Sequence, residues 1–214
     1  DVIKKPYICV QPVNHPGVEP YKSMWRFTNG LPSWTWHGCN QNDAKVDVFA
    51  KAHSIKLILN GKEIGVQKIV DLKTLFTVKY EPGNLEAISL DENGNEIARS
   101  KLVSAKDEDV KIVLTPEEKE VKLNDIVYVK VRISDSNGII ESNDDSKIKL
   151  KVIGGELLGF GSGNPRSEEK FTTGEYTTYY ERSLAVIVCT HKDLLYLIAE
   201  YNKGRHSSTE VLVI

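Results

Sequence analysis

Short runs of alternating apolar and polar residues, separated by turn sequences, extend from Lys45 to the end of the chain. In the clearest run, four apolar residues alternate with polar or aromatic ones: Val127, Val129, Val131 and Ile133. Another run, Ile55–Leu59, is followed by Asn60-Gly61, a dipeptide typical of a two-residue β-hairpin turn because both residues tolerate positive φ. Strands spaced by about 8–12 residues predict antiparallel β-sandwiches. We therefore expect an all-β protein without helices of ordinary length.

The length of 214 residues fits two domains of about 100 residues each. Residues 1–24 are expected to form an extended connector, because prolines remove backbone donors and disfavour helix before them: Pro6, Pro12, Pro16 and Pro20. The first sandwich is expected over residues 25–105 and the second over residues 106–214. The charged segment Ser104–Asp109 marks the boundary between them.

Charge and composition argue against two classes of partner. The net charge is −2, from 28 basic and 30 acidic residues, so no basic excess exists to neutralise nucleic-acid phosphates. No apolar run approaches the roughly 20 residues that a membrane-spanning helix needs. We predict neither a nucleic-acid partner nor a membrane partner.

Three cysteines, Cys9, Cys39 and Cys189, are too few and too far apart for a disulfide framework. This usage favours a reducing compartment and a cytoplasmic location, with a secreted parent protein as the open alternative. His37 and Cys39, with His15 or Cys9, do not show the tight, repeated spacing of structural zinc ligands. We predict no metal and no cofactor.

Two motifs resemble catalytic sequences. Asn95-Glu96 matches the pair that carries the acid/base glutamate in many retaining glycosidases, which need a second carboxylate about 5–5.5 Å away. Here the pair ends the turn Asp91–Asn95, so a solvated hairpin is the favoured interpretation. Gly159–Gly163 resembles a phosphate loop, but no helical pattern follows it, so a tight turn or bulge is expected.

All three tryptophans lie within Trp25–Gly38, at Trp25, Trp34 and Trp36. Exposed aromatic side chains stack on sugars, but tryptophans equally suit a core or a seam between domains. Packing or interdomain contact is favoured over ligand binding, because tryptophan tends to be buried. Tyr179 and Tyr180 are further candidates for contact with a carbohydrate.

Several motifs resemble the region that follows the catalytic barrel in glycoside hydrolase family 2, which includes the bacterial β-galactosidases. They occur in the family's order and spacing: Ser33–Gly38 (SWTWHG), Val46–Phe49 (VDVF), Ile55–Lys62 (IKLILNGK), Tyr80–Gly83 (YEPG) and Glu156–Pro165 (ELLGFGSGNP). The resemblance covers about Lys22 to the C-terminus. It implies two consecutive immunoglobulin-like β-sandwiches in the C-terminal part of a β-galactosidase-like enzyme.

The resemblance also implies that the family's catalytic glutamates lie upstream of these motifs, so no residue here is a candidate for either role. The first hypothesis is a non-catalytic accessory part that braces the barrel of the same polypeptide or supports a homo-oligomer. Alternatives are a module that binds oligosaccharide on exposed aromatic residues, and a surface adhesin built of immunoglobulin-like repeats.

Overall fold

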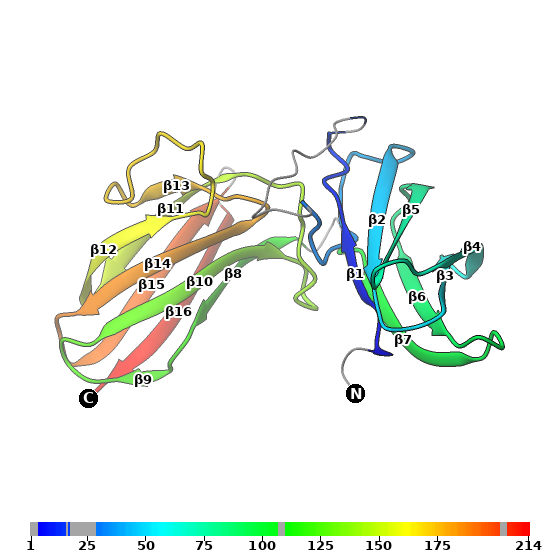
Figure 1. Ribbon diagram of the computed structural model, residues 1–214. Helices are drawn as coiled ribbons and strands as arrows, with labels where there is room; N and C mark the ends of the chain where they lie inside the picture. Colours follow the sequence, from blue (N-terminus) through cyan, green and yellow to red (C-terminus); the bar gives the residue numbers. More distant parts are fainter. Residues whose placement is uncertain (1–3, 16, 18–28, 107–109, 202–204) are drawn as a thin grey trace. The chain divides into compact units, whose positions relative to one another are not determined.

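A computed structural model describes residues 4–15, 17, 29–106, 110–201 and 205–214. The chain divides into two compact units, residues 1–104 and 105–214 (Figure 1). Each unit consists of two β-sheets, and the expected all-β fold with antiparallel sandwiches is confirmed. Among the described residues, no helix is long and apolar enough to cross a membrane.

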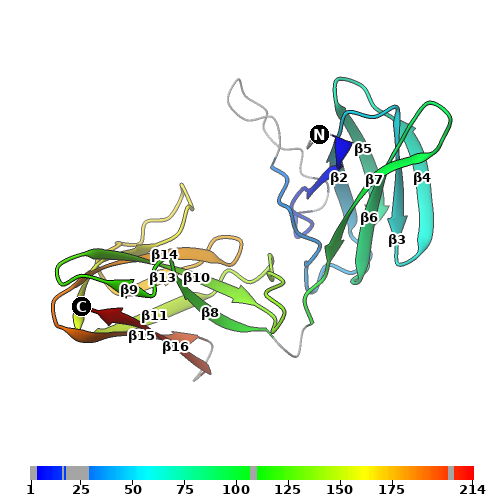
Figure 2. The same ribbon diagram turned by 90° about the horizontal axis from the view of Figure 1, so that it is seen from below.

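The first unit pairs a three-stranded sheet with a four-stranded one (Figure 2). The smaller sheet has the order β1-β2-β5, with β1 at Tyr7–Val10, β2 at Asp43–Phe49 and β5 at Lys73–Lys79. The larger sheet has the order β4-β3-β6-β7, with β3 at Ser54–Leu59, β4 at Lys62–Lys68, β6 at Asn84–Leu90 and β7 at Glu96–Val103. All pairs in both sheets are antiparallel.

Strand β3 shows how the alternating pattern builds this unit. Ile55, Leu57 and Leu59 are buried, whereas the residues between them are partly exposed. Asn60 and Gly61 follow with φ of 51° and 80°, as a type I′ turn requires, and connect β3 directly to β4. The predicted hairpin is therefore present at its expected residues.

The structure differs from the expected connector at the N-terminus, where residues 7–10 form a strand. Strand β1 pairs with β2 in a register that places Tyr7 opposite Phe49 and Val10 opposite Val46. Its three consecutive apolar residues after Tyr7 are buried, and burial of that run outweighs the prolines on either side. The run is too short to show a strand period in the sequence.

The second unit pairs a four-stranded sheet with a five-stranded one. The four-stranded sheet has the order β12-β14-β10-β8, with β8 at Lys111–Pro116, β10 at Ile126–Ser134, β12 at Gly155–Gly161 and β14 at Arg182–Cys189. The five-stranded sheet has the order β13-β11-β15-β16-β9, with β9 at Glu120–Val121, β11 at Lys147–Ile153, β13 at Glu175–Thr177, β15 at Asp193–Tyr201 and β16 at Arg205–Val213. Only β9 and β16, among the described pairs, run parallel.

Strand β10 carries one face of this unit's core, as its alternation predicts. Val127, Val129, Val131 and Ile133 are buried in one continuous apolar cluster between the two sheets. Tyr128 and Arg132 are exposed and Lys130 is half-buried on the opposite, outer face. Strand β14 continues both faces, because its residues pair with β10 so that Leu184 lies opposite Lys130.

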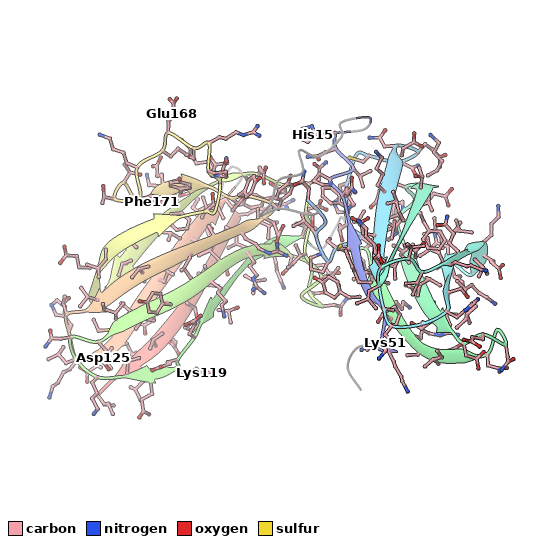
Figure 3. The ribbon with its side chains drawn as sticks, in the orientation of Figure 1. His15, Lys51, Lys119, Asp125, Glu168 and Phe171 are labelled. Atoms are coloured by element: carbon pink, nitrogen blue, oxygen red, sulfur yellow. The ribbon has the colours of Figure 1, made fainter. Side chains whose placement is uncertain are left out.

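Most of the glycine-rich segment forms a strand, because residues Gly155–Gly161 make up β12. The register with β14 shifts between Leu157 and Gly159, so a bulge lies inside the strand, just before the Gly159–Gly163 segment where a turn or bulge between strands was expected. Gly161 permits the Phe171 ring to lie against the backbone, since a Cβ on Gly161 would lie 2.2 Å from Phe171 Cδ1. The ring stacks on buried Tyr176 at a centroid distance of 5.2 Å. Phe171 lies on the loop between β12 and β13 (Figure 3).

Candidate functional site

Trp34 and Trp36 lie inside the first unit with no exposed surface. The Trp34 ring packs edge-on against Tyr80 at 5.0 Å, and its Nε1–H donates to the carbonyl of Glu81 at 3.0 Å. The backbone N–H of Trp36 donates to the Tyr80 hydroxyl at 2.9 Å. These contacts make both tryptophans packing residues of this unit and leave no face for a sugar. Trp25 lies outside the described residues.

Tyr179 and Tyr180 stand at the tight turn that leads into β14. The backbones of Tyr179 and Arg182 exchange hydrogen bonds of 3.1 and 3.2 Å, so Tyr180 and Glu181 are the two central residues. Their φ values are 47° and 63°, the type I′ geometry that normally selects Asn and Gly. The two tyrosine rings contact each other at 4.5 Å, and both residues are partly exposed.

Asp145 helps to hold this turn in its unusual conformation. Its Oδ1 accepts the backbone N–H of Tyr180 at 2.7 Å. The carbonyl of Glu181 accepts the N–H of Ile133 at 3.2 Å, which ties the turn to β10. Backbone strain of this kind is maintained only where surrounding contacts determine the conformation.

The side chain of Glu181 is fully buried beneath this turn. Arg182 Nε lies 3.0 Å from its Oε1. Burial raises the pKa of Glu181 to about 9, and the nearby Arg182 and Arg132 guanidiniums oppose that shift only in part. The carboxyl group is therefore neutral in the folded protein at pH 7. Nothing in the sequence indicates this burial, since Glu181 stands between Tyr180 and Arg182 without a recognisable motif.

Glu96 of the Asn95-Glu96 pair lies at the start of an exposed hairpin strand. The Arg99 guanidinium contacts Glu96 at 2.8 Å and Glu86 at 2.9 Å, and thus bridges the two carboxylates. The hydrogen bonds from Arg99 lower the pKa of Glu96. A glycosidase acid needs the opposite shift, since it must hold its proton near neutral pH. The solvated-hairpin interpretation accounts for these contacts.

His37 and Cys39 lie in the loop before β2, where the Cys39 thiol contacts the carbonyl of His37 at 3.8 Å. Within the part of the chain that the structure describes, no three His, Cys, Asp or Glu side chains are grouped so that they could hold a metal ion. Cys9, Cys39 and Cys189 are all described and buried, and none of them forms a disulfide.

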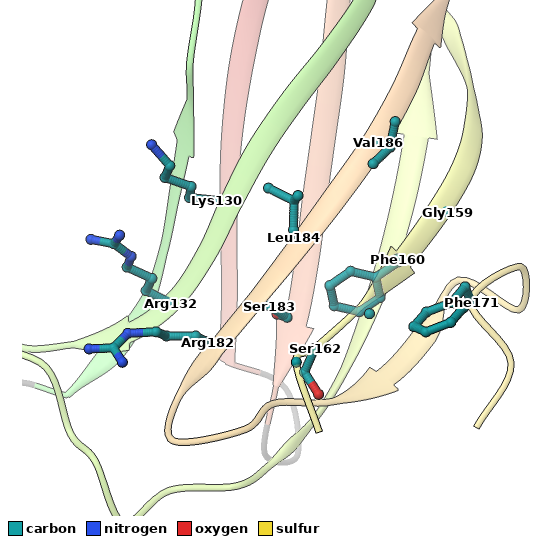
Figure 4. A pocket seen from close by; sticks show the side chains of 12 residues that line it. Lys130, Arg132, Gly159, Phe160, Ser162, Phe171, Arg182, Ser183, Leu184 and Val186 are labelled. Atoms are coloured by element: carbon teal, nitrogen blue, oxygen red, sulfur yellow. The ribbon is translucent and has the colours of Figure 1, made fainter. Parts of the chain in front are cut away.

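A pocket of about 530 Å³ opens on the outer face of the β12-β14-β10 sheet. Lys130, Arg132 and Arg182 line one side of it, and the Phe171 ring and Ser162 line the other, with Leu184 between them (Figure 4). Gly159 of β12 leaves room at the pocket, because an added Cβ would have no neighbour closer than 4.0 Å, whereas the Phe171 ring occupies the space at Gly161. Sequence reasoning missed this pocket. The alternation of β10 indicates that Lys130 and Arg132 face outward, but it does not show which strand lies beside them.

Comparison with known protein families links each unit to a family model. Residues 42–98 match a domain of unknown function, DUF4982. Residues 112–203 match the glycoside hydrolase family 2 C-terminal domain 5. The second match covers the core strands of the second unit and the pocket described above.

One curated relative is the β-galactosidase BoGH2A of Bacteroides ovatus, which is 29% identical over 175 residues. The match covers 78% of this chain and 20% of the relative, so the chain spans about a fifth of that protein's length.

Solved structures share the fold. A glycosyl hydrolase family 2 member from Bacteroides cellulosilyticus superposes with a TM-score of 0.80 at 23% identity, covering 96% of this chain and 28% of that one. A β-glycosidase from Bacteroides vulgatus gives a TM-score of 0.72 at 19% identity, covering 98% of this chain and 25% of that one. The family matches, together with this fold, confirm the resemblance inferred from the motifs.

Proposed function

Because this chain is a C-terminal β-sandwich region of glycoside hydrolase family 2, we propose that it is a non-catalytic accessory part of a β-galactosidase-like enzyme, and that it braces the catalytic barrel or an oligomer. The observation that carries the proposal is the family match over residues 112–203. The short coverage of the relatives supports it further, since most of their length lies outside the matched region.

Exposed apolar side chains of the first unit support a bracing contact. The turn between β4 and β5 presents Val70 at 69% exposure and Leu72 at 55%. Asp71 and Leu72 have φ of 48° and 63°, so the turn holds a bulky apolar residue in a left-handed conformation. Apolar side chains that project from a tight turn suit burial against a partner surface. The barrel of the same polypeptide is the partner we propose.

Hydrolysis of an aryl β-galactoside by the purified chain tests the proposal directly. We expect no turnover above the buffer rate, because Glu96, which carries the glycosidase-like motif, is ion-paired and exposed. Turnover that scales with protein concentration and survives repurification would refute the non-catalytic assignment.

The bracing role needs the parent polypeptide. We expect Leu72→Ser to lower the melting temperature of the parent while it leaves that of the isolated chain unchanged, because Leu72 is exposed in the isolated unit. Lys51→Ser, at another exposed position of this unit, is the matched control. Equal melting temperatures for the two parent variants would refute a contact at this turn. Sedimentation of the isolated chain tests the homo-oligomer.

A carbohydrate-binding module is the second candidate, and the contact between the Tyr179 and Tyr180 rings favours it. Both rings lie at a constrained turn, and a preorganised aromatic pair loses little freedom on stacking against a sugar. NMR titration with lactose and a galactan tests this, with Tyr179→Ala as the variant. Unchanged tyrosine resonances throughout would remove the candidate.

We also propose the reducing, cytoplasmic location that the cysteine usage suggested. The three buried cysteines support it, since none of them forms a disulfide in the described part of the chain. Fractionation of cells that produce the parent tests this location, and recovery of the parent in the medium would refute it.

A further inference from the structure

We propose that the pocket on the outer face of the β12-β14-β10 sheet, lined by Lys130, Arg132, Arg182 and Phe171, binds an acidic saccharide. Its volume of about 530 Å³ lies within the range of small-ligand pockets, about 300–1,000 Å³. A hollow of this size suits one or two sugar rings better than a flat protein surface. These residues are distinct from the Tyr179–Tyr180 pair.

Three positively charged side chains line one side of the pocket. Arg132 and Arg182 are directly opposite each other on β10 and β14, and like charges at such positions destabilise a sheet. Lys130, two residues along the same face, adds a third positive charge. An anion bound between these side chains would relieve the repulsion.

Two carboxylates form ion pairs with these cations in the described part of the chain. Glu117 lies 3.1 Å from Lys130 Nζ, where both side chains are about half exposed. Glu181 lies 3.0 Å from Arg182 Nε but is buried behind the turn. Since burial keeps Glu181 neutral at pH 7, it adds little negative charge. Glu141 and Asp145 also act on Glu181 and so add negative charge near the two arginines. The three cations that line the pocket are the groups available to a bound anion.

The other side of the pocket suits the apolar face of a sugar ring. Phe171 is 56% exposed although its ring stacks on Tyr176, so one face of the ring is covered and surface remains for a ligand. Leu184, 38% exposed, lies between this ring and the cations (Figure 4). Gly159 leaves the strand uncovered beside this ring, and Gly161 allows the ring to lie against the backbone.

The cationic side of the pocket and its aromatic side together indicate the chemical class of the ligand. A saccharide that carries a carboxylate or sulfate group can place its C–H face on Phe171 and its anion near the two guanidiniums, which bind such groups in bidentate fashion. The requirement for an anion rests on the pocket itself. The saccharide class rests on the proposed function in a glycosidase.

Titration of the full chain with three tetrasaccharides of equal length tests the inference by calorimetry and by NMR of backbone amides. The probes are a galacturonic acid tetramer, a sulfated galactose tetramer and a neutral galactose tetramer, with inorganic sulfate as a fourth. We expect at least one acidic tetramer to bind about tenfold more tightly than the neutral one, as one charge-assisted hydrogen bond allows. The Gly161 and Leu184 amide signals should shift.

Substitutions locate the site. Arg132→Gln should weaken binding of the acidic tetramer about tenfold, and Phe171→Ala should weaken both acidic and neutral tetramers. Lys151→Gln, on the other sheet of the same unit, is the matched control and should change nothing. Arg132 and Phe171 are exposed, so both variants should fold, which circular dichroism checks.

Three outcomes would overturn the proposal: equal binding of acidic and neutral tetramers, no binding of any probe, or affinity unchanged by Arg132→Gln. Inorganic sulfate binding as tightly as the sulfated tetramer would overturn the saccharide class alone. None of these results alters the hydrolysis assay, so a failure here is distinguishable from a failure of the proposed accessory role.

Discussion

Replacing Glu181 by glutamine should stabilise the second unit at neutral pH. The pKa of this carboxyl is about 9 in the folded chain and 4.5 as an ordinary glutamate. Between pH 4.5 and pH 9 the Glu181 carboxyl is protonated in the folded protein but ionised in the unfolded chain. The contribution of Glu181 to stability is therefore fully present below pH 4.5 and is lost as the pH rises toward 9. Glutamine is neutral in both states and removes this dependence.

The magnitude follows from the difference between the two pKa values. Each pKa unit corresponds to about 1.4 kcal/mol, and the interval from 4.5 to pH 7 spans about 2.5 units. We expect Glu181→Gln to unfold at nearly the wild-type urea concentration near pH 5, and to be about 3 kcal/mol more stable at pH 7. Side-chain shape is nearly conserved, so packing beneath the turn should be unaffected.

Urea unfolding of the full chain provides the assay, because its two units have separable signals. All three tryptophans precede Ser104 in the sequence, and Trp34 and Trp36 are buried in the first unit, so tryptophan fluorescence follows that unit and serves as an internal control. Circular dichroism follows both units. Glu200→Gln, an exposed site on β15, is the matched variant and should not alter the pH dependence.

The reasoning would be refuted if Glu181→Gln changed stability by the same amount at pH 5 and pH 7. A variant less stable than wild type at pH 7 would equally contradict it, since the ionised carboxylate would then be the stabilising form.

Three further substitutions test the fold. Val131→Asp should unfold the second unit, because an unpaired buried carboxylate costs several kcal/mol. Tyr128→Asp, on the exposed face of the same strand, should be tolerated. A cooperative melt shown by both variants would contradict the assignment of the two faces. Gly61→Val should cost about 1–2 kcal/mol in urea unfolding through its φ of 80°, while Gly65→Ala, with an ordinary φ and open space, should cost under 1 kcal/mol. Trp34→Phe should lower the free energy of unfolding of the first unit by about 1–2 kcal/mol through the lost hydrogen bond and packing, and an unchanged fluorescence midpoint would argue against the described contacts.

The strands that could be predicted are those whose pattern is local. Strand segments Ile55–Leu59 and Val127–Ile133 bury one face only, so buried apolar residues alternate with more exposed ones along the sequence. Strand β4 was implied only by the hairpin signal of Asn60-Gly61, because its own residues are almost all exposed and form no buried face. Strand β12 was obscured by glycines that serve packing against Phe171, a residue ten positions away from Gly161.

The candidate site was less predictable, because its residues come together only through strand pairing. Lys130 and Leu184 are cross-strand neighbours although 54 positions separate them, and no local signal specifies that partner. The burial of Glu181 likewise depends on contacts of its turn with β10 and Asp145. Burial of Trp34 and Trp36, by contrast, agreed with the general tendency of tryptophan.

The two type I′ turns have different consequences for how the units fold. Asn60-Gly61 favours its turn conformation in the unfolded chain, so β3 and β4 can pair early and serve as a local nucleus. Tyr180-Glu181 does not favour its turn conformation in the unfolded chain. Pairing of β14 with β10 therefore joins residues that are far apart in the sequence, such as Ile126 and Val188. Loop closure over that length slows the search. We therefore expect the first unit to refold in the faster kinetic phase, with the strained turn closing after the second sandwich has formed.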